Sequence, residues 1–375
     1  MNMKKSLIAM AVAGAVAVPM AAQADAGAYG RVNVALQYTN DDAADASASG
    51  VNPPSSSTPG PFGPYPGAYY PAGAAPAGGN SGLGLTNVVS RFGFKGDEDL
   101  GNGLTAMYRY EFAVDSTSAT IQSGNRLSWI GLKGDFGMVK AGRIWSAWYD
   151  YIGWNTDRSW YLGGPGYYGM SNYGGAPSTR TSDTIQYTWG GGGYGSDPFT
   201  FSVEATMNPN SSTNAGLSAT NDPQDIDHMT VAGMGTFGPV QVNAAYSKAS
   251  MDQSGGNVSE PSETAIGVRW TSGPLYVGGS YITSDPDTAA NNNPSAIDLL
   301  ATYDMGGGLS GQIGVGSLDA DTTGGAGDQT SVFLNLDKAL SSRTHTYGEF
   351  RSVDQDLGAN SITTQVLLVG MLHNF

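Results

Sequence analysis

Side chains capable of catalysis occur in this sequence, but their spacing does not build a catalytic site. The run Gly164–Gly169 has the glycine spacing of a nucleotide-binding loop, yet Pro165 interrupts it and no strand–turn–helix pattern surrounds it. The three histidines, His228, His345 and His373, are too scattered to suggest a metal site. Serine, histidine and aspartate are present, but no G-x-S-x-G nucleophile motif occurs. We therefore expect no enzyme activity, no cofactor and no metal.

A long aromatic segment is the stronger candidate for a functional element. Residues 145–179 join two strand-like runs and carry ten aromatic rings between Trp145 and Tyr173. A connection of this length inside a compact domain is typically functional or disordered. So many rings argue against disorder, because they need surfaces to pack against. We therefore expect this segment to fold inward, against the elements that surround it.

Composition limits the class of protein. The chain of 375 residues has a formal net charge of −15, which disfavours nucleic-acid binding, and it has no cysteine for disulfides or thiolate metal sites. Residues 1–24 have the features of a secretory signal. Lys4 and Lys5 precede an apolar run, and small residues form a cleavage site that ends at Ala24. We therefore expect cleavage after Ala24 and export from the cytoplasm.

Alternation of apolar and polar residues recurs along the mature chain. In residues 199–206, aromatic and aliphatic side chains alternate with Thr200, Ser202, Glu204 and Thr206. This pattern is typical of β-strands that have one apolar and one polar face. No apolar run of the mature chain reaches the roughly 18 residues of a membrane-spanning helix. Strands of this kind build either soluble sandwiches or membrane barrels.

The lengths of the connections favour the barrel. Short and long connections alternate, as in bacterial outer-membrane barrels, which have short periplasmic turns and long outer loops. Gly134–Gly137 and Met305–Gly308 are short, whereas residues 40–86, 145–179 and 208–225 are long. Counting strands between them gives sixteen, an even number that lets the sheet close without an edge. The sequence predicts an all-β fold, a transmembrane antiparallel up-and-down β-barrel that spans residues 25–375.

The sequence also resembles a known family. The runs AYGRVNVALQY, SRFGFKGDEDLGNGLTAMYRYEF and NRLSWIGLKGDFGMVKAGR are similar to the general diffusion porins of Gram-negative bacteria. The resemblance is strongest over Tyr29–Arg143 and over the last strand. It implies a sixteen-stranded homotrimeric barrel whose third loop, residues 145–179, folds into the lumen and constricts it. It also implies that the terminal Phe375 is a signature read by the outer-membrane assembly machinery.

The resemblance further implies a cluster of basic side chains on the wall at the constriction. By motif these are Arg31, Arg91, Arg126 and Arg180. The alternation supports an inward direction, since Arg31 shares a face with Asn33 and Gln37, and an arginine turned to lipid near mid-membrane costs about 2–4 kcal/mol. For Arg91 and Arg126, a place at the level of the lipid headgroups is the alternative.

In that family, carboxylates on the third loop face the basic wall. The best-matching run here is YDYIGWNTDRSWYLGG, which offers Asp150 and Asp157. Arg158 adds a positive charge, and Tyr161 stands where the family commonly has a glutamate. The acidic half of the constriction therefore departs from the family pattern.

The expected function is passive diffusion of small hydrophilic solutes and ions across the outer membrane. Size exclusion by the loop and an electrostatic filter of wall arginines are the expected mechanism. One alternative is a substrate-selective channel in which rings such as Trp154 and Trp160 form a track for sugars. Another is a closed barrel that serves as a surface adhesin or receptor.

The outer loops suggest further partners. Residues 40–86 are rich in proline, glycine, alanine and serine, which favours extended or disordered backbone, and we expect them to project at the outer surface. Other outer loops carry acidic residues without Lys or Arg, for example Asp319, Asp321 and Asp328. These carboxylates are expected to bind lipopolysaccharide through divalent cations.

Overall fold

The structure is a computed structural model of the chain. It describes residues 26–41, 81–161, 163–170, 175–177, 179–191, 197–207, 226–252, 258–287, 292–322, 327–356, 358 and 361–375. The predicted signal segment, residues 1–24, and most of the predicted 40–86 loop lie outside the described residues. None of the helices in the described part of the chain has the length and apolar composition needed to cross a membrane.

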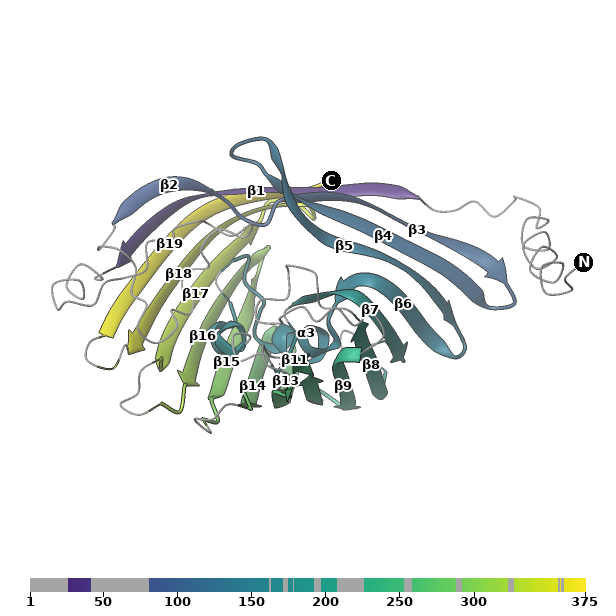
Figure 1. The fold of residues 1–375 in the computed structure, drawn as a ribbon. Helices are drawn as coiled ribbons and strands as arrows, with labels where there is room; N and C mark the ends of the chain where they lie inside the picture. Colours follow the sequence, from purple (N-terminus) through teal and green to yellow (C-terminus); the bar gives the residue numbers. More distant parts are fainter. Residues whose placement is uncertain are drawn as a thin grey trace, which may run out of the picture.

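The wall strands form one closed antiparallel sheet (Figure 1). Consecutive strands pair with one another, and the last, β19 (Ser361–Asn374), pairs with the first, β1 (Gly27–Asp41). In chain order the other strands of the sheet are β2 (Gly82–Asn87), β3 (Arg91–Gly101), β4 (Leu104–Asp115), β5 (Thr120–Gly134), β6 (Gly137–Trp145), β7 (Arg180–Trp189), β8 (Phe199–Met207), β9 (Ile226–Phe237), β10 (Val240–Ala249), β13 (Ser262–Ser272), β14 (Leu275–Asp285), β15 (Ser295–Gly306), β16 (Leu309–Asp319), β17 (Gln329–Ala339) and β18 (Thr344–Asp356). A separate two-stranded ribbon consists of β11 (Met251–Asp252) and β12 (Val258–Ser259).

Two of these strands, β2 and β3, are halves of one wall strand. The C-terminal part of β1 pairs with β2 and the N-terminal part pairs with β3, and the register shifts by one residue between them. The extra residue forms a β-bulge at Val88–Ser90, where Val89 adopts a φ of 48° that β-branched residues rarely adopt. The Ser90 hydroxyl holds the bulge by accepting from the Asn33 N–H at 2.9 Å and donating to the Asn33 carbonyl at 3.1 Å. The seventeen strands of the sheet are therefore sixteen wall strands, which confirms the predicted barrel.

Side chains along the wall alternate between an apolar outer face and a polar inner face. In β8, Phe199 and Phe201 are exposed on the outer face, whereas Thr200, Ser202 and Glu204 are buried on the inner face. Successive side chains of a strand point to opposite faces. An apolar band outside and polar groups inside are what a strand between lipid and an aqueous lumen requires.

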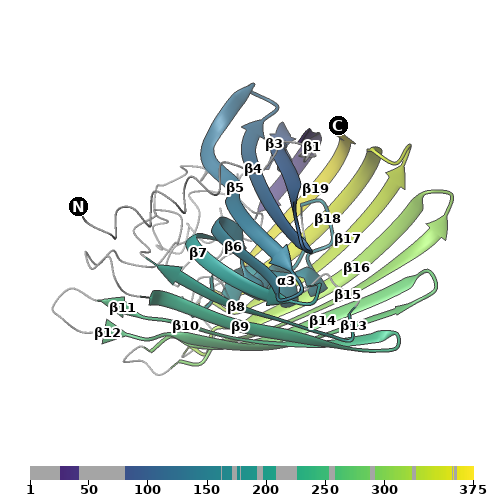
Figure 2. The same cartoon turned by 90° about the vertical axis from the view of Figure 1, so that its right-hand side faces the viewer.

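The connection between β6 and β7 lies on the concave side of the sheet. It contains α3 (Ala147–Tyr151), the 3₁₀ turn η1 (Gly153–Asn155) and α4 (Pro165–Met170). Both views of the ribbon place α3 within the curve of the strands (Figures 1 and 2). All three elements contact wall strands between β8 and β16.

Phe375 packs at the seam where the barrel closes. Its backbone exchanges two hydrogen bonds with Gly30, at 3.0 and 3.1 Å. Its ring covers Gly30, since a β-carbon added at Gly30 would lie 2.2 Å from the Phe375 Cζ. The seam therefore depends on both residues.

We expect Phe375→Ala to lower the amount of protein in the outer membrane and to leave unfolded protein in the periplasm. The substitution removes a ring from the seam and from the signature that the assembly machinery is expected to read. Immunoblots of fractionated cells measure both pools. Gly30→Val is the comparison variant, because it displaces the ring from the seam but keeps it at the C-terminus. A smaller loss in Gly30→Val than in Phe375→Ala would assign the effect to the signature. Wild-type levels of the Phe375→Ala protein would contradict the prediction.

Candidate functional site

We call residues 145–179, the connection between β6 and β7, the inner segment. Its helical elements pack on one side of the barrel: α3 against β8 to β10, η1 against β13 and β14, and α4 against β14 to β16. Trp160 and Tyr161 pack against a cluster on β1, β18 and β19. Buried rings such as Trp148 and Tyr151 lie in one cluster with small wall residues such as Ala232 and Ala265. The small residues leave the space that the rings fill.

The first turn of α3 is fixed by two polar side chains. A helix start leaves backbone N–H groups without partners in the helix. The Ser146 hydroxyl accepts from the Tyr149 N–H at 3.1 Å. On the wall, Glu204 of β8 accepts from the Ala147 N–H at 2.7 Å. The wall therefore supplies part of the cap of this helix.

Two more wall carboxylates hold the main chain of the inner segment. Asp298 of β15 accepts two N–H groups in the first turn of α4, at 2.9 and 2.8 Å. Glu349 of β18 accepts the N–H groups of Trp160 and Tyr161, at 2.6 and 3.1 Å. Hydrogen bonds to charged groups contribute about 1.5–3 kcal/mol each. The segment is thus attached by its backbone at widely separated strands.

Asn155, the last residue of η1, sits in a socket of wall side chains. Its side-chain oxygen accepts from the Asn243 Nδ2 at 3.1 Å and from the Arg269 Nε. Its Nδ2 donates to the Ser280 hydroxyl at 3.1 Å, and its carbonyl accepts from the Tyr276 hydroxyl at 2.7 Å. Every polar group of the Asn155 side chain is therefore satisfied by the wall.

Two wall glycines make room for this socket. A β-carbon at Gly267 on β13 would lie 2.0 Å from the Asn155 Nδ2. A β-carbon at Gly278 on β14 would lie 2.2 Å from the Asn155 carbonyl oxygen. Distances this short exclude any side chain at either position while η1 is seated.

The two acids predicted for the constriction, Asp150 and Asp157, both lie in the inner segment. Asp157 accepts from the Tyr149 hydroxyl at 2.8 Å and from the Tyr168 hydroxyl at 2.6 Å, and it lies within electrostatic reach of Arg180. Burial raises the pKa of Asp157, while the two hydroxyls act in the opposite direction. Asp150 is buried in α3.

The other two predicted loop residues contact the strands beneath them. The Arg158 guanidinium lies 3.8 Å from the ring centroid of Tyr276 and 5.4 Å from that of Trp154. The Arg158 carbonyl accepts from the Gln312 amide at 3.1 Å. Tyr161 is attached through its N–H to Glu349.

The four predicted wall arginines come together from four strands of the wall, and Arg31 and Arg91 are direct partners in the pairing of β1 with β3. Arg31 lies on β1, Arg91 on β3, Arg126 on β5 and Arg180 on β7. Arg91 is within electrostatic reach of the other three. Arg126 pairs with Glu111 at 2.6 Å, and the Arg91 Nε lies 3.9 Å from the same carboxylate.

Two further residues of this cluster were missed by the sequence reasoning. Glu111 and Arg109 of β4 form an ion pair at 2.8 Å, and the Tyr29 hydroxyl donates to Glu111 at 3.0 Å. The signal that could have found them is the alternation of residues 104–114, which places both on the polar face. Three guanidinium groups around one carboxylate leave two positive charges.

Two tryptophans join the arginines to the inner segment. The Arg31 guanidinium lies 4.7 Å from the ring centroid of Trp160, and the Arg180 guanidinium lies 4.1 Å from that of Trp145. A cation over an aromatic face is attracted by the ring quadrupole, and the attraction grows when water is excluded. The rings therefore hold these guanidinium groups beside the inner segment.

Comparison with known proteins agrees with this architecture. Two curated relatives are the major outer membrane proteins P.IB of Neisseria meningitidis serogroup B and of Neisseria gonorrhoeae. The first is 32% identical over 165 residues, which cover 41% of this chain and 41% of the relative. The second is 33% identical over 143 residues, which cover 38% of this chain and 32% of the relative. The matched region thus spans less than half the length of these relatives.

Solved porin structures share the fold. An anion-selective porin from Comamonas acidovorans superposes with a TM-score of 0.68 at 18% identity, covering 94% of this chain and 100% of that chain. The complex of Salmonella typhi OmpF with daunomycin superposes with a TM-score of 0.64 at 16% identity, covering 93% and 97%. The model of the Gram-negative porin family matches residues 9–358, most of the chain. With its closed sixteen-stranded barrel, the protein therefore belongs to the Gram-negative porin family of the outer membrane.

Proposed function

We propose that the protein is a water-filled channel for passive diffusion of small hydrophilic solutes and ions, narrowed by the inner segment. The observation that carries the proposal is the uneven packing of the inner segment. Its helical elements α3, η1 and α4 contact the wall from β8 to β16, and Trp160 reaches β1, β17 and β18. On the side of β1 to β7, Arg91 and Arg109 keep 21% and 32% of their side-chain surface exposed. Solutes pass between these two sides.

Two features of the structure determine which solutes pass through the channel. The anchored inner segment sets the size limit, because its backbone is bonded to several strands at once and cannot swing aside freely. The arginine cluster sets the charge preference, because a narrow passage with walls of low dielectric focuses the field of fixed charges. Membership of the porin family points to a channel rather than an enzyme, and the proposal involves no reaction step.

A sugar-selective channel is the second candidate, suggested by the many rings of the inner segment. Two half-buried rings of the segment already carry arginines on their faces. Trp160 carries Arg31 on its face and donates its indole N–H to Asp337 at 2.6 Å. Trp145 carries Arg180 and stacks on Tyr149 at 4.8 Å between ring centroids. These contacts reduce the ring surface left for a sugar, which favours the general channel.

Liposome swelling with neutral solutes of graded size tests the proposal. A general channel gives swelling rates that fall smoothly with solute size. Saturation by one sugar would assign the selective channel instead. A barrel that admits no solute, as expected for an adhesin or receptor, would overturn the proposal.

Two further proposals concern the oligomeric state of the protein and its binding of lipopolysaccharide. We propose a homotrimer, supported by the match to Vibrio cholerae OmpT in a trimer form (TM-score 0.61, 16% identity, 94% of this chain and 99% of that chain). We also propose that acidic outer loops bind lipopolysaccharide through divalent cations. Some of their carboxylates tie neighbouring loops together: Asp321 accepts from the Asn293 N–H at 2.6 Å. Native mass spectrometry of the extracted protein, with and without a chelator, tests both.

Ion preference is expected to depend on salt concentration. The outer loops are acidic, for example at Asp285, Asp319 and Asp328, whereas the cluster on β1 to β7 is positive. The Debye length is about 30 Å at 0.01 M and about 3 Å at 1 M, so salt screens the distant loop acids more than the arginines beside the permeating ion. We predict a cation preference in dilute salt that fades or turns to a weak anion preference in concentrated salt. Reversal potentials in planar bilayers measure it. A strong cation preference at 1 M would contradict the inward assignment of the arginines.

A further inference from the structure

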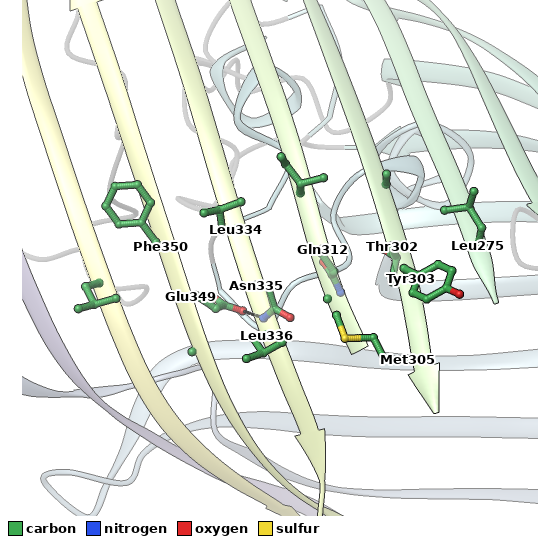
Figure 3. A pocket seen from close by; sticks show the side chains of 15 residues that line it. Leu275, Thr302, Tyr303, Met305, Gln312, Leu334, Asn335, Leu336, Glu349 and Phe350 are labelled. Carbon is green, nitrogen blue, oxygen red and sulfur yellow. Dashed lines mark hydrogen bonds between the residues drawn. The ribbon is translucent and has the colours of Figure 1, made fainter. Parts of the chain in front are cut away.

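The outer face of the barrel carries a hollow near the short turns of strands β14 to β18. Its volume is about 510 Å³, within the range of about 300–1,000 Å³ typical of ligand pockets. Apolar side chains of neighbouring strands surround it (Figure 3). Chief among them are Tyr303, Met305, Leu334 and Leu336, all about half exposed.

Two glycines on the outer face create this hollow. Gly311 of β16 and Gly348 of β18 both pair with Leu336 of β17, so they lie on either side of it. A β-carbon at Gly348 would approach only the Leu368 carbonyl, at 3.8 Å, and one at Gly311 would meet the flexible end of Met305 at 2.8 Å. Glycine inside a strand often marks a site that another molecule approaches closely.

A positive charge lies at the interfacial end of the hollow. Lys338 is two residues beyond Leu336 on the same face of β17, about 7 Å along the strand. Its ammonium group donates to the Gly307 carbonyl in the turn after β15, at 2.6 Å. Arg343 adds a second positive charge in the next turn, and Asp304 one negative charge at the end of β15. An apolar hollow with an ammonium group at its rim has the chemistry of a phospholipid site.

We propose that the hollow binds one acyl chain of a phospholipid and that Lys338 pairs with the phosphate of the same lipid. Short turns of outer-membrane barrels face the periplasm, so the lipid belongs to the periplasmic leaflet. Bulk lipid is as apolar as the hollow, so the hydrophobic effect does not favour the site. Van der Waals contact in a fitted cavity and the phosphate–ammonium pair do. One lipid therefore stays on the barrel while its neighbours exchange.

Native mass spectrometry of the folded protein in mild detergent, titrated with dioleoylphosphatidylglycerol, tests this site. Gly348→Leu fills the hollow and is expected to weaken the tightest lipid binding about tenfold. Lys338→Gln keeps the hollow but removes the charge, and is expected to weaken binding roughly fivefold. Gly311→Val fills the hollow from the other side, and it replaces Gly348→Leu if that variant does not fold.

Gly233→Leu is the matched control, because it adds the same side chain at another glycine of the wall, on β9. A β-carbon there makes only ordinary contacts, at 3.5 Å or more. The control is expected to bind lipid as the wild type does. Equal lipid binding by the filled variants, or equal loss in the control, would overturn the proposal. If the filled variants changed the number of protomers but not the number of bound lipids, the hollow would be a contact with a second copy of the chain. That result would also overturn the proposal.

Discussion

Gly278→Val is expected to raise the single-channel conductance and to make it fluctuate. The added β-carbon would lie 2.2 Å from the Asn155 carbonyl oxygen and 2.6 Å from the Tyr276 hydroxyl that donates to it. The 3₁₀ turn η1 must then leave its socket, and the hydrogen bonds of the Asn155 side chain are lost. Overpacking of this kind costs about 1–3 kcal/mol. The inner segment loosens while the wall stays folded.

Planar-bilayer recordings measure the conductance, and heat-modifiable mobility on gels confirms that the barrel is folded. Gly233→Val is the matched control, because it introduces the same side chain at a wall glycine where a β-carbon has ordinary contacts. The control should conduct as the wild type does. An unchanged conductance of folded Gly278→Val protein would mean that the inner segment does not limit the flow of ions.

Glu111→Gln is expected to shift the ion preference of the channel strongly toward anions. Glu111 contacts Arg91, Arg109 and Arg126, so its neutralisation raises the net charge of this group from two to three positive charges. Removing one partner of a buried ion pair costs about 3–5 kcal/mol, and Arg126 is only 2% exposed. We therefore expect a lower thermal stability together with the altered preference.

Reversal potentials in a salt gradient separate this effect from a general change in surface charge. Glu260→Gln is the matched control, since it removes one carboxylate from an exposed pair with Lys248 outside the arginine cluster. At high salt the control should have no effect, because an exposed charge is screened. Equal shifts in both variants at high salt would place Glu111 outside the conducting path.

The strand pattern could be predicted from the sequence because it depends on local alternation. Residues 199–206 show both faces of β8 directly, and the lengths of the connections give sixteen strands. The bulge at Val88–Ser90 could not be predicted in this way. It arises from pairing with β1, and the hydrogen bonds that hold the bulge next to the strained Val89 join Ser90 to the distant Asn33.

Some residues of the candidate site could be predicted from the sequence, but most of their contacts could not. Motif and alternation identified Arg31, Arg91, Arg126 and Arg180, which the structure brings together. Alternation says which face a side chain occupies but not what covers that face. Glu204, Asp298 and Glu349 lie on the polar face of their strands, but their hydrogen bonds to the inner segment could not be predicted from that pattern. The tyrosine partners of Asp157 likewise come from folding of the segment on itself.

Attachment of the inner segment through its main chain affects how such a channel evolves. Glu204, Asp298 and Glu349 accept from backbone N–H groups, which every residue except proline possesses. Side chains of the segment that face the passage can be exchanged without breaking these anchors. Natural selection for the passage of particular solutes can then change those side chains while the position of the segment stays the same. Descendants of this protein can therefore differ in permeability without any change in the barrel or in the position of the inner segment.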